Sequence, residues 1–422
     1  MPYESWGRSI ASTPRAVVPL QFPPAALPDD DLLLPYGLGR SYGDVCLNNE
    51  HTLLDVSRMD HFRSFDAERG VIDVEGGASL DAILRVIVPR GWFLPVTPGT
   101  KFVTIGGCIA NDVHGKNHHR AGTFGRHVLS LSLLRSDGSL TRCAPGDALF
   151  AATIGGLGLT GLITSAEVQL RRIESPSITE EKIPFRTLAE FDELSRTSDA
   201  THEYSVAWFD SFSGHDPRGI FFRANHSISP CGTGILAGAP HGIPGSLLSP
   251  LLNKATINLF NKTYFHANKN PQPHQTSIEK FFYPLDAIKN WNTIYGRQGF
   301  LQYQFVTADQ NAVKEILERV AQSKRASFLT VIKRFGALPS PGLLSFPREG
   351  TTVCFDFAAT PSIYPLLDDL DDIVLASGGA IYPAKDSRMS AETFRRSFPR
   401  AGEFATFIDP RFSSSFRRRV GL

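Results

Sequence analysis

Three glycine-rich clusters constrain the fold of this chain more than any other feature of its sequence. They read PYGLGRSYGD at 35–44, PGTKFVTIGGCIANDVHGKNHH at 98–119 and AATIGGLGLTGLI at 151–163. Glycine lets a backbone turn tightly and approach a ligand closely, so that amides can surround an anion. The first cluster follows an apolar run and predicts a phosphate nest, although it has neither the Rossmann nor the P-loop spacing.

The other two clusters suit close contact with a ligand as well. Gly106 and Gly107 are expected to open a helix that faces a pyrophosphate. The third cluster suits a planar ligand, and a tight turn between strands explains it equally well. Near the C-terminus, Lys385 lies in the segment IYPAKDSR at 381–388, where a lysine beside an acid is usually a solvated surface pair.

Residues 1–175 surround these clusters with short β-like runs at 52–56, 71–74 and 127–134. One helix is expected over 80–87, because its apolar residues share a face, Ser79 can cap its start and Gly91 follows its end.

The pattern changes over residues 176–379, where strand-like runs alternate with amphipathic helices. Strands are expected at 204–208, 301–305 and 353–357, and helices at 313–320 and 366–374. Strict alternation puts Gln302 and Gln304 on one face, and puts Thr352, Cys354 and Asp356 on one face of their own strand. This predicts a sheet with helices packed on one side. Residues 225–280, rich in proline, glycine and polar residues, predict one or two mobile loops, either anchored on the core or acting as a lid.

Length and composition exclude several classes of protein. A chain of 422 residues is too long for one core and predicts two domains, or three. A net charge of +1 excludes a general nucleic-acid binder. Five scattered cysteines without a CxxC pair exclude a disulfide scaffold and a zinc ribbon, and favour a reducing compartment. Neither a signal peptide nor a membrane span of about 20 apolar residues is expected, so a lipid substrate would be met at the membrane surface.

A metal site is the main alternative for the second cluster. His114 and His118 have an i,i+4 spacing, but that spacing requires a helix, and Gly115 opposes one. No acidic pair or cysteine nearby completes a ligand set. The sequence therefore predicts no metal.

Taken in order, the segments GLGRSYGD, PGTKFVTIGGCIANDVHGKNHHRAGTFG, GGLGLTG, GFLQYQFV, IKRFG and AKDSR resemble a known family. It is the flavoprotein oxidase of the decaprenylphosphoryl-β-D-ribose 2'-epimerase system. The similarity runs from about residue 30 to the C-terminus. HGKNHH and KDSR are specific, whereas the glycine turns are shared by flavoproteins of the vanillyl-alcohol-oxidase type. The stretch Thr351-Thr352-Val353 departs from the family pattern, so sugar preference follows from the resemblance less directly than the cofactor does.

The resemblance implies an α+β fold of two lobes. A vanillyl-alcohol-oxidase/PCMH-type FAD-binding lobe would comprise residues 1–175 and 380–422. A substrate lobe built on an antiparallel sheet would be inserted at 176–379, with the flavin ring at the interface between lobes. Arg40 stands where covalent relatives carry a histidine, which implies non-covalent FAD.

The resemblance also assigns residues to the site. FAD would be held by Pro35, Tyr36, Gly37, Leu38, Gly39, Arg40, Ser41, Tyr42, Gly43, Asp44, Val45, Gly99, Thr104, Ile105, Gly106, Gly107, Asn111, Asp112, Val113, His114, Ile163 and Tyr382. The substrate side would be lined by Tyr42, His114, Lys116, Tyr283, Gln302, Gln304, Lys333, Cys354 and Lys385.

The implied activity is oxidation of the 2'-hydroxyl of a polyprenyl-phosphoryl pentose to a 2'-keto sugar, the first half of an epimerisation in cell-wall arabinan synthesis. Lys385 is the first candidate for the base, because desolvation lowers a lysine pKa, and His114 and Tyr42 are alternatives. Lys116 and Lys333 could hold phosphate or sugar oxygens, and Cys354 is expected in the pocket without a catalytic role.

A separate NAD(P)H-dependent short-chain reductase would complete the epimerisation, since this chain has no Rossmann fingerprint. The protein is expected in the cytoplasm or peripherally at a membrane, on either face of it. Two other interpretations stay open. One is a flavin oxidase of a free polyol or aldonolactone, and the other is a phosphate-ligand binding protein that has lost its chemistry.

Overall fold

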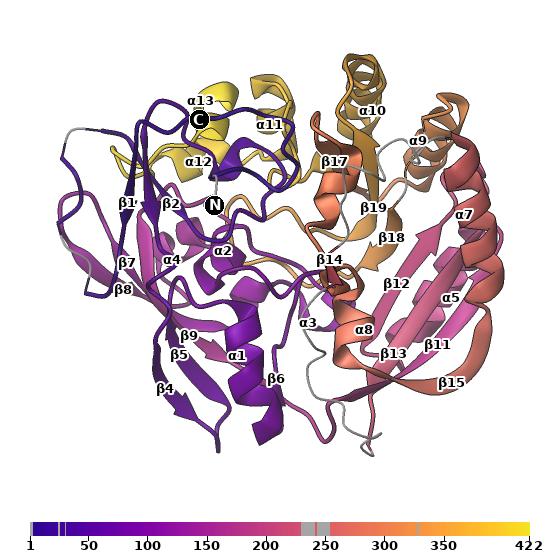
Figure 1. Ribbon diagram of the computed structural model, residues 1–422, viewed down its shortest axis with the longest axis horizontal. Helices are drawn as coiled ribbons and strands as arrows, with labels where there is room; N and C mark the ends of the chain where they lie inside the picture. The colour runs from indigo at the N-terminus through magenta and orange to yellow at the C-terminus, as the bar shows by residue number, and fades with distance from the viewer. Residues whose placement is uncertain are drawn as a thin grey trace.

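The fold is described from a computed structural model, which describes residues 3–23, 26–29, 31–228, 241–242, 254–325, 327 and 329–422. It combines helices with one small parallel sheet and two larger antiparallel sheets (Figure 1). Among the described residues, no helix has the length and apolar character needed to cross a membrane.

The N-terminal part of the chain forms two of these sheets. The three-stranded parallel sheet has the order β1-β3-β2, and the five-stranded antiparallel sheet has the order β4-β5-β9-β7-β8. The strands are β1 (Ala16–Pro19), β2 (Leu33–Tyr36), β3 (Thr52–Asp55), β4 (Phe62–Asp66), β5 (Val71–Glu75), β7 (Val128–Leu134), β8 (Leu140–Cys143) and β9 (Leu162–Gln169). Helices α1 (Leu80–Ile87), α2 (Ile105–Ala110), α3 (His118–Ala121) and α4 (Ala148–Thr153) connect them, with a small β6 (Trp92–Phe93) and β10 (Arg171–Arg172) ribbon.

The second large sheet is antiparallel throughout, in the order β15-β11-β13-β12-β18-β19-β17-β20. Its strands are β11 (Ser177–Phe185), β12 (Tyr204–Phe209), β13 (Gly219–His226), β15 (Asn270–Ser277), β17 (Phe300–Thr307), β18 (Thr330–Phe335), β19 (Gly350–Ala358) and β20 (Ala380–Ile381). Nearby lie α8 (Ile278–Phe282) and the short pair of β14 (His241–Gly242) with β16 (Ile288–Lys289).

The two faces of this sheet have different neighbours. Helices α5 (Leu188–Asp199), α9 (Gln310–Gln322) and α10 (Tyr364–Ala376) pack on one face, where Ala207 and Phe209 join the main core (Figure 1). The alternate residue Trp208 points to the opposite face and packs against Phe265 of α7 (Lys254–Ala267). Helices therefore cover parts of both faces, which corrects the prediction that they pack on one side only.

A second correction concerns residues 225–280, expected to be loops. The described part contains the helix α7 and the strand β15. Pro271 and Pro273 lie in β15, and prolines in a sequence normally argue against a strand. They are tolerated here because β15 is the edge strand of the sheet, where a residue without an N–H need not donate to a neighbouring strand. Residues 229–240 and 243–253 of the predicted loops lie outside the described residues.

The remaining predicted elements are confirmed. Ser79 caps α1 by accepting a hydrogen bond from the Ala82 amide, and Gly91 follows with a φ of 78°. The expected strands appear within β3, β5, β7, β12, β17 and β19, and the expected helices within α9 and α10.

The C-terminal segment returns to the N-terminal part of the chain. It forms α11 (Ala391–Ser397), α12 (Ala401–Ala405) and α13 (Ser415–Val420), next to β1 and β2 in Figure 1. The Ser413 amide donates to the Leu33 carbonyl, and the Ser415 amide donates to the Leu47 carbonyl. Residues distant in sequence thereby reach one site, which lies between the N-terminal loops and the eight-stranded sheet.

Candidate active site

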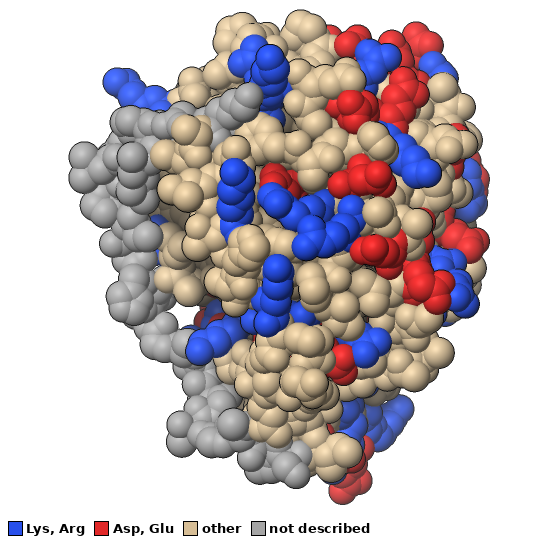
Figure 2. Space-filling model, turned by 90° about the vertical axis from the view of Figure 1, so that its right-hand side faces the viewer, with Lys and Arg blue, Asp and Glu red and all other residues tan. Residues whose placement is uncertain are grey.

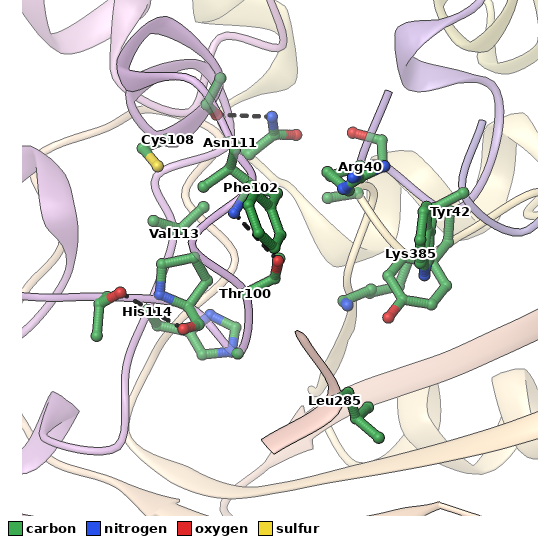
Figure 3. A pocket seen from close by; sticks show the side chains of 18 of the residues that line it. Arg40, Tyr42, Thr100, Phe102, Cys108, Asn111, Val113, His114, Leu285 and Lys385 are labelled. Carbon is green, nitrogen blue, oxygen red and sulfur yellow. Dashed lines mark hydrogen bonds between the residues drawn. The ribbon is translucent and has the colours of Figure 1, made fainter. Parts of the chain in front are cut away.

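A cavity of about 1210 Å³ lies between the glycine-rich loops and the open face of the eight-stranded sheet. This exceeds the roughly 300–1,000 Å³ of an ordinary small-molecule pocket. Figure 3 shows Arg40, Tyr42 and Lys385 on one side of it, and Asn111, Val113 and His114 across from them.

Most residues predicted to hold the cofactor line this cavity. They are Pro35, Gly37, Leu38, Gly39, Arg40, Ser41, Tyr42, Val45, Gly99, Thr104, Gly106, Gly107, Asn111, Val113, His114, Ile163 and Tyr382. A Cβ added at Gly99 would meet no atom within 4 Å, so the backbone there is open to a ligand. A Cβ at Gly37 would instead lie 2.6 Å from the Thr104 hydroxyl, so glycine lets these two loops meet.

Five predicted cofactor residues lie behind the lining instead: Tyr36, Gly43, Asp44, Ile105 and Asp112. These residues build the loops. The Tyr36 hydroxyl donates to the Glu4 carbonyl, and Asp112 accepts from the Gly125 amide and the Ser345 hydroxyl. Gly43 lets the first loop touch the segment after Lys385, since a Cβ there would lie 1.7 Å from the Asp386 carbonyl oxygen.

Three residues that line the cavity each have a polar atom that lacks a hydrogen-bond partner among the described residues. The Asn111 Oδ1, the His114 Nδ1 and the Gln302 Oε1 are buried without a hydrogen bond to described residues. A buried polar group of this kind costs free energy unless a ligand or water satisfies it. The glycine-lined wall together with these groups fits a large polar ligand with a planar ring and phosphates, which is what FAD is.

His114 is held as a neutral ring. Burial and the nearby Lys333 hold its pKa well below the usual range. The Gln304 Nε2 donates to the His114 Nε2 at 3.1 Å, so the ring proton is on Nδ1. The ring packs between Phe335 and Tyr382, at centroid distances of 4.9 and 5.3 Å. With Nδ1 protonated and the Nε2 lone pair engaged by Gln304, His114 has no free lone pair to accept a proton, which weakens its candidacy as the base.

Lys385 lies against Tyr42, with its Nζ 3.7 Å from the centre of the tyrosine ring. Burial lowers the pKa of Lys385, and the nearby Cys354 and Asp356 oppose that effect. Burial also raises the pKa of Tyr42, so its phenol is neutral. The arrangement places an amine that can lose its proton over the ring of a neutral tyrosine in the cavity lining, and such an amine can act as a general base toward an alcohol.

Two more lysines line the same cavity and are half-buried. Burial lowers the pKa of Lys333 to about 7 and that of Lys116 to about 8. The Lys333 ammonium donates to the Gly115 carbonyl at 3.3 Å, and the Lys116 ammonium donates to the Phe281 carbonyl. Neither forms an ion pair with a described carboxylate within 4 Å, so both cations are available to an anionic ligand.

The strands β17 and β19 form the floor beneath these groups. Gln304 pairs with Cys354, and Gln302 pairs with Asp356, so the expected shared face is confirmed. Burial keeps Cys354 as a thiol, because it raises the thiol pKa. Sequence reasoning missed Asp356 as a site residue, although its alternation with Cys354 indicated the same face. Asp356 is fully buried, accepts from the Gln302 amide, and has its pKa raised by burial.

The structure also corrects Tyr283, which was expected to line the substrate side. Its side chain is 1% exposed and lies behind the wall, where its hydroxyl is 2.7 Å from the Thr97 hydroxyl. Tyr283 ends α8 and packs with Phe282, so its ring belongs to the core under the loop at 97–100.

A charge cluster that sequence reasoning did not identify joins the two edges of the site. Arg419 of α13 donates to both Asp44 carboxylate oxygens, at 2.7 and 2.8 Å, and to Asp386 at 2.9 Å. The Tyr42 amide donates to the Ala384 carbonyl nearby. Arg419 therefore ties the first glycine loop to the segment that carries Lys385.

Comparison with known proteins agrees with this cavity. A family described as an FAD binding domain matches residues 28–144. This defines a flavoprotein, and FAD is its cofactor.

Relatives extend the comparison over most of the chain. The chain is 36% identical to decaprenylphosphoryl-β-D-ribose oxidase of Mycolicibacterium smegmatis, over 92% of this chain and 88% of that protein. It is 30% identical to an uncharacterised protein from the mprA 5' region of Streptomyces coelicolor, over 82% of this chain and 100% of the other. Alditol oxidase of a Streptomyces species is 25% identical over 31% of this chain and 32% of its own length. The chain thus belongs to the decaprenylphosphoryl-β-D-ribose oxidase family of FAD-dependent oxidoreductases.

Proposed function

We propose that this protein oxidises the 2'-hydroxyl of a polyprenyl-phosphoryl ribose to the 2'-keto sugar. One observation carries the proposal: a cavity built on the FAD-binding segments also contains three half-buried lysines, Lys116, Lys333 and Lys385. Lysines without a carboxylate partner among the described residues suit a substrate with a phosphate next to a sugar. The 36% identity to a decaprenylphosphoryl-β-D-ribose oxidase supports that substrate class.

Bound FAD supplies the acceptor for the hydride that leaves the sugar carbon. The residues of this chain would manage the proton and the substrate's position. Lys385, as the free amine, accepts the hydroxyl proton, and the neutral Tyr42 phenol orients the same oxygen. Gln302 and Gln304 offer amides from the sheet floor, while Lys116 and Lys333 hold the phosphate. Cys354 contributes surface and no proton transfer.

The cofactor site is proposed to be the wall formed by the 37–45, 99–114 and 161–163 segments with Tyr382. We propose that FAD is bound without a covalent link. Arg40 at the first loop lies 4.1 Å over the Trp6 ring and donates to the Leu38 carbonyl, and its guanidinium is not a nucleophile. Acid precipitation should release all flavin into the supernatant, and flavin retained in the pellet would disprove this assignment.

We also propose that residues 1–175 and 380–422 form one FAD-binding lobe around an inserted substrate lobe at 176–379. The return of α11–α13 to β2 supports this division, as does the position of the cavity between the glycine-rich loops and the eight-stranded sheet. The split would place the lobe boundary at β20, which pairs with β17 of the substrate sheet.

Peripheral contact with a membrane is proposed on the side that carries α7. Figure 2 shows Lys and Arg side chains across the middle of the face that carries α7 and β15, with Asp and Glu side chains beside them. On α7, the exposed Leu259 stands near the exposed Lys262, a combination that favours an anionic lipid surface. Sedimentation with vesicles of phosphatidylglycerol should bring down the wild type more than K262E, and equal sedimentation would refute the contact.

A separate NAD(P)H-dependent short-chain reductase is the proposed partner. Oxidation leaves a keto sugar, and a hydride must return to the opposite face of that carbon to complete an epimerisation. The FAD-binding family that matches residues 28–144 accounts for the oxidation half alone.

The decisive experiment is anaerobic reduction of the bound flavin, followed in the visible spectrum. Bleaching by a polyprenyl-phosphoryl ribose, and not by free polyols, is the expected result. Bleaching by a free polyol or an aldonolactone alone would replace the proposal with a free-sugar oxidase. A protein that binds FAD and is bleached by neither would refute the enzymatic function.

A further inference from the structure

The cavity extends beyond the proposed reaction site, across the open face of the eight-stranded sheet. This extension, called the apolar wing, is lined by Val206, Trp208, Phe222, Phe260, Tyr264 and Val331. None of these residues is needed to hold a cofactor or to move a proton. Their chemistry therefore indicates a second, apolar part of the ligand.

Strand register makes the wing continuous with the reaction site. Cys354 of β19 pairs with Val331 of β18, and Val331 pairs with Trp208 of β12. Side chains that are opposite each other on neighbouring strands share a face of the sheet. An apolar row thus runs from the floor under the proposed sugar site to the far side of the sheet.

A second row runs parallel to the first. Val206 of β12 pairs with Phe222 of β13, and Phe222 pairs with Lys182 of β11. Lys333 lies two residues from Val331 and so faces the same side. Lys333 lies at the end of this row nearest the proposed reaction site, and the aliphatic stem of Lys182 lies at the opposite end. The surface between the two lysines is apolar.

Helix α7 forms the roof of the wing. Tyr264 packs on Trp208 with ring centroids 4.8 Å apart, and Phe260 stacks on Tyr264 at 5.6 Å. Phe260 lines the cavity and is 37% exposed, so the wing reaches the molecular surface at this helix. The neighbouring Leu259 is 67% exposed and does not line the cavity.

We propose that the apolar wing binds the first isoprene units of the substrate's prenyl chain, which leaves the protein beneath α7. This inference rests on the proposed function. The occupant must place an anion near Lys333 and an uncharged chain along Val331, Trp208 and Phe222, and a prenyl phosphate meets both requirements. A free sugar phosphate would leave the apolar rows unpaired, and a fatty acid would bring no sugar to Lys385.

Two substrates that share one head group test the inference. Farnesyl-phosphoryl-β-D-ribose and methyl-phosphoryl-β-D-ribose differ only in the tail. For the wild-type holoenzyme, kcat/KM should be at least about tenfold higher with the farnesyl compound, which corresponds to about 1.4 kcal/mol of apolar contact. The ratio of the two kcat/KM values measures tail recognition and is insensitive to the amount of active enzyme.

Variants inside and outside the wing localise the effect. Phe260→Ser should reduce the farnesyl-to-methyl ratio several-fold, because it removes an aromatic ring from the wing. Phe62→Ser is the matched control, since it makes the same change at a phenylalanine of similar exposure, 38% against 37%, on β4 outside the cavity, and its ratio should equal that of the wild type. Val206→Phe, which narrows the floor with an apolar group, should lower the ratio too.

Each outcome decides the matter. A wild-type ratio near one, with both compounds oxidised, would overturn the wing and leave the proposed function standing. A high ratio that Phe260→Ser and Val206→Phe leave unchanged would also overturn this location for the chain. Oxidation of neither compound by a protein that holds FAD would overturn the proposed function and the wing with it.

Discussion

Arg419 gives the sharpest test of how the site is held together. Its guanidinium contacts Asp44, in the turn after the first glycine loop, and Asp386, next to Lys385. The carboxylate side chains of Asp44 and Asp386 are only 5% and 4% exposed. Replacing Arg419 with methionine keeps much of the apolar stem and removes the only side-chain cation paired with Asp44 among the described residues.

The expected cost follows from the two carboxylates left behind. Breaking a buried ion pair by removing one partner costs about 3–5 kcal/mol, because a charge stays buried without compensation. Here two carboxylates lose a partner, so R419M should lose at least about 3 kcal/mol of unfolding free energy. The exposed Arg400–Glu403 pair, with side chains 57% and 51% exposed, is the matched control, and R400M should cost less than about 1 kcal/mol.

The pH dependence of the stability of R419M provides an independent test, because the direction of the change can be predicted. Burial already raises the pKa of Asp44, and Arg419 opposes this effect. Without Arg419, the folded-state pKa rises further above the unfolded value, so the folded state binds more protons than the unfolded state in that range. The instability of R419M relative to the wild type should therefore grow as the pH rises through the carboxyl pKa values.

Urea unfolding of the FAD-loaded protein at several pH values measures the loss of unfolding free energy and its pH dependence. The affinity for FAD measures the effect of the variant on the site. The triple variant R419M/D44N/D386N should recover part of the lost stability, because it removes the unpaired charges. R419K should weaken FAD binding less than R419M, since it keeps one cation. Equal losses in R419M and R400M, or no recovery in the triple variant, would refute the reasoning.

Further predictions concern the cavity itself. Lys385→Ala should retain FAD and slow flavin reduction by about 10²–10⁴-fold, the usual contribution of a general base. In the wild type, flavin reduction should accelerate with pH through a pKa below the ordinary lysine value of about 10.4, because burial lowers the pKa of Lys385. A normal rate in the variant would remove the base assignment. Lys333→Met should raise Tm by a few degrees at pH 7 while it weakens substrate binding. A lysine with a folded-state pKa of about 7 costs stability, and this cost disappears only as the pH rises toward the pKa of lysine in the unfolded state. An unchanged Tm would argue against burial of Lys333. Cys354→Ser should turn over at close to the wild-type rate, and a loss above about tenfold would give the thiol a role. Gly99→Val should fold normally and bind FAD more weakly, since its side chain would enter open space at the cavity wall, and unchanged flavin content would remove Gly99 from the cofactor site.

Local sequence patterns predicted the elements that local physics determines. The 80–87 helix is specified by its own apolar face and the Ser79 cap, and the alternation at 301–305 already put Gln302 and Gln304 together. Residues 254–277 could not be predicted in this way. Polar residues and two prolines disguise β15, and the edge position that tolerates them depends on pairing with β11, a contact distant in the sequence.

The same distinction separates the site residues that were found from those that were missed. Lys385 resembles a surface lysine in its own segment, and its surroundings come from residues distant in the sequence, such as Tyr42 and Cys354. Arg419 lies in a run of three arginines that reads as a solvated helix end, and its role depends on carboxylates more than 30 residues away in the chain. Tyr283 is the opposite case, a residue that was predicted in the site and lies outside it. The family resemblance placed Tyr283 in the pocket, whereas in the structure its hydroxyl contacts the Thr97 hydroxyl behind the cavity lining.

The charge pattern of the cavity links its stability to its ligands. Lys116 and Lys333, the two lysines proposed to hold the phosphate, have pKa values lowered by burial, so each costs free energy in the protein without ligand. An anion that enters raises these pKa values again, and protons are taken up as it binds. The cost of burying the lysines is therefore offset only when a phosphate-bearing molecule occupies the site. This arrangement favours a phosphorylated sugar over a neutral one of the same shape, because the neutral sugar gains nothing from the added charge.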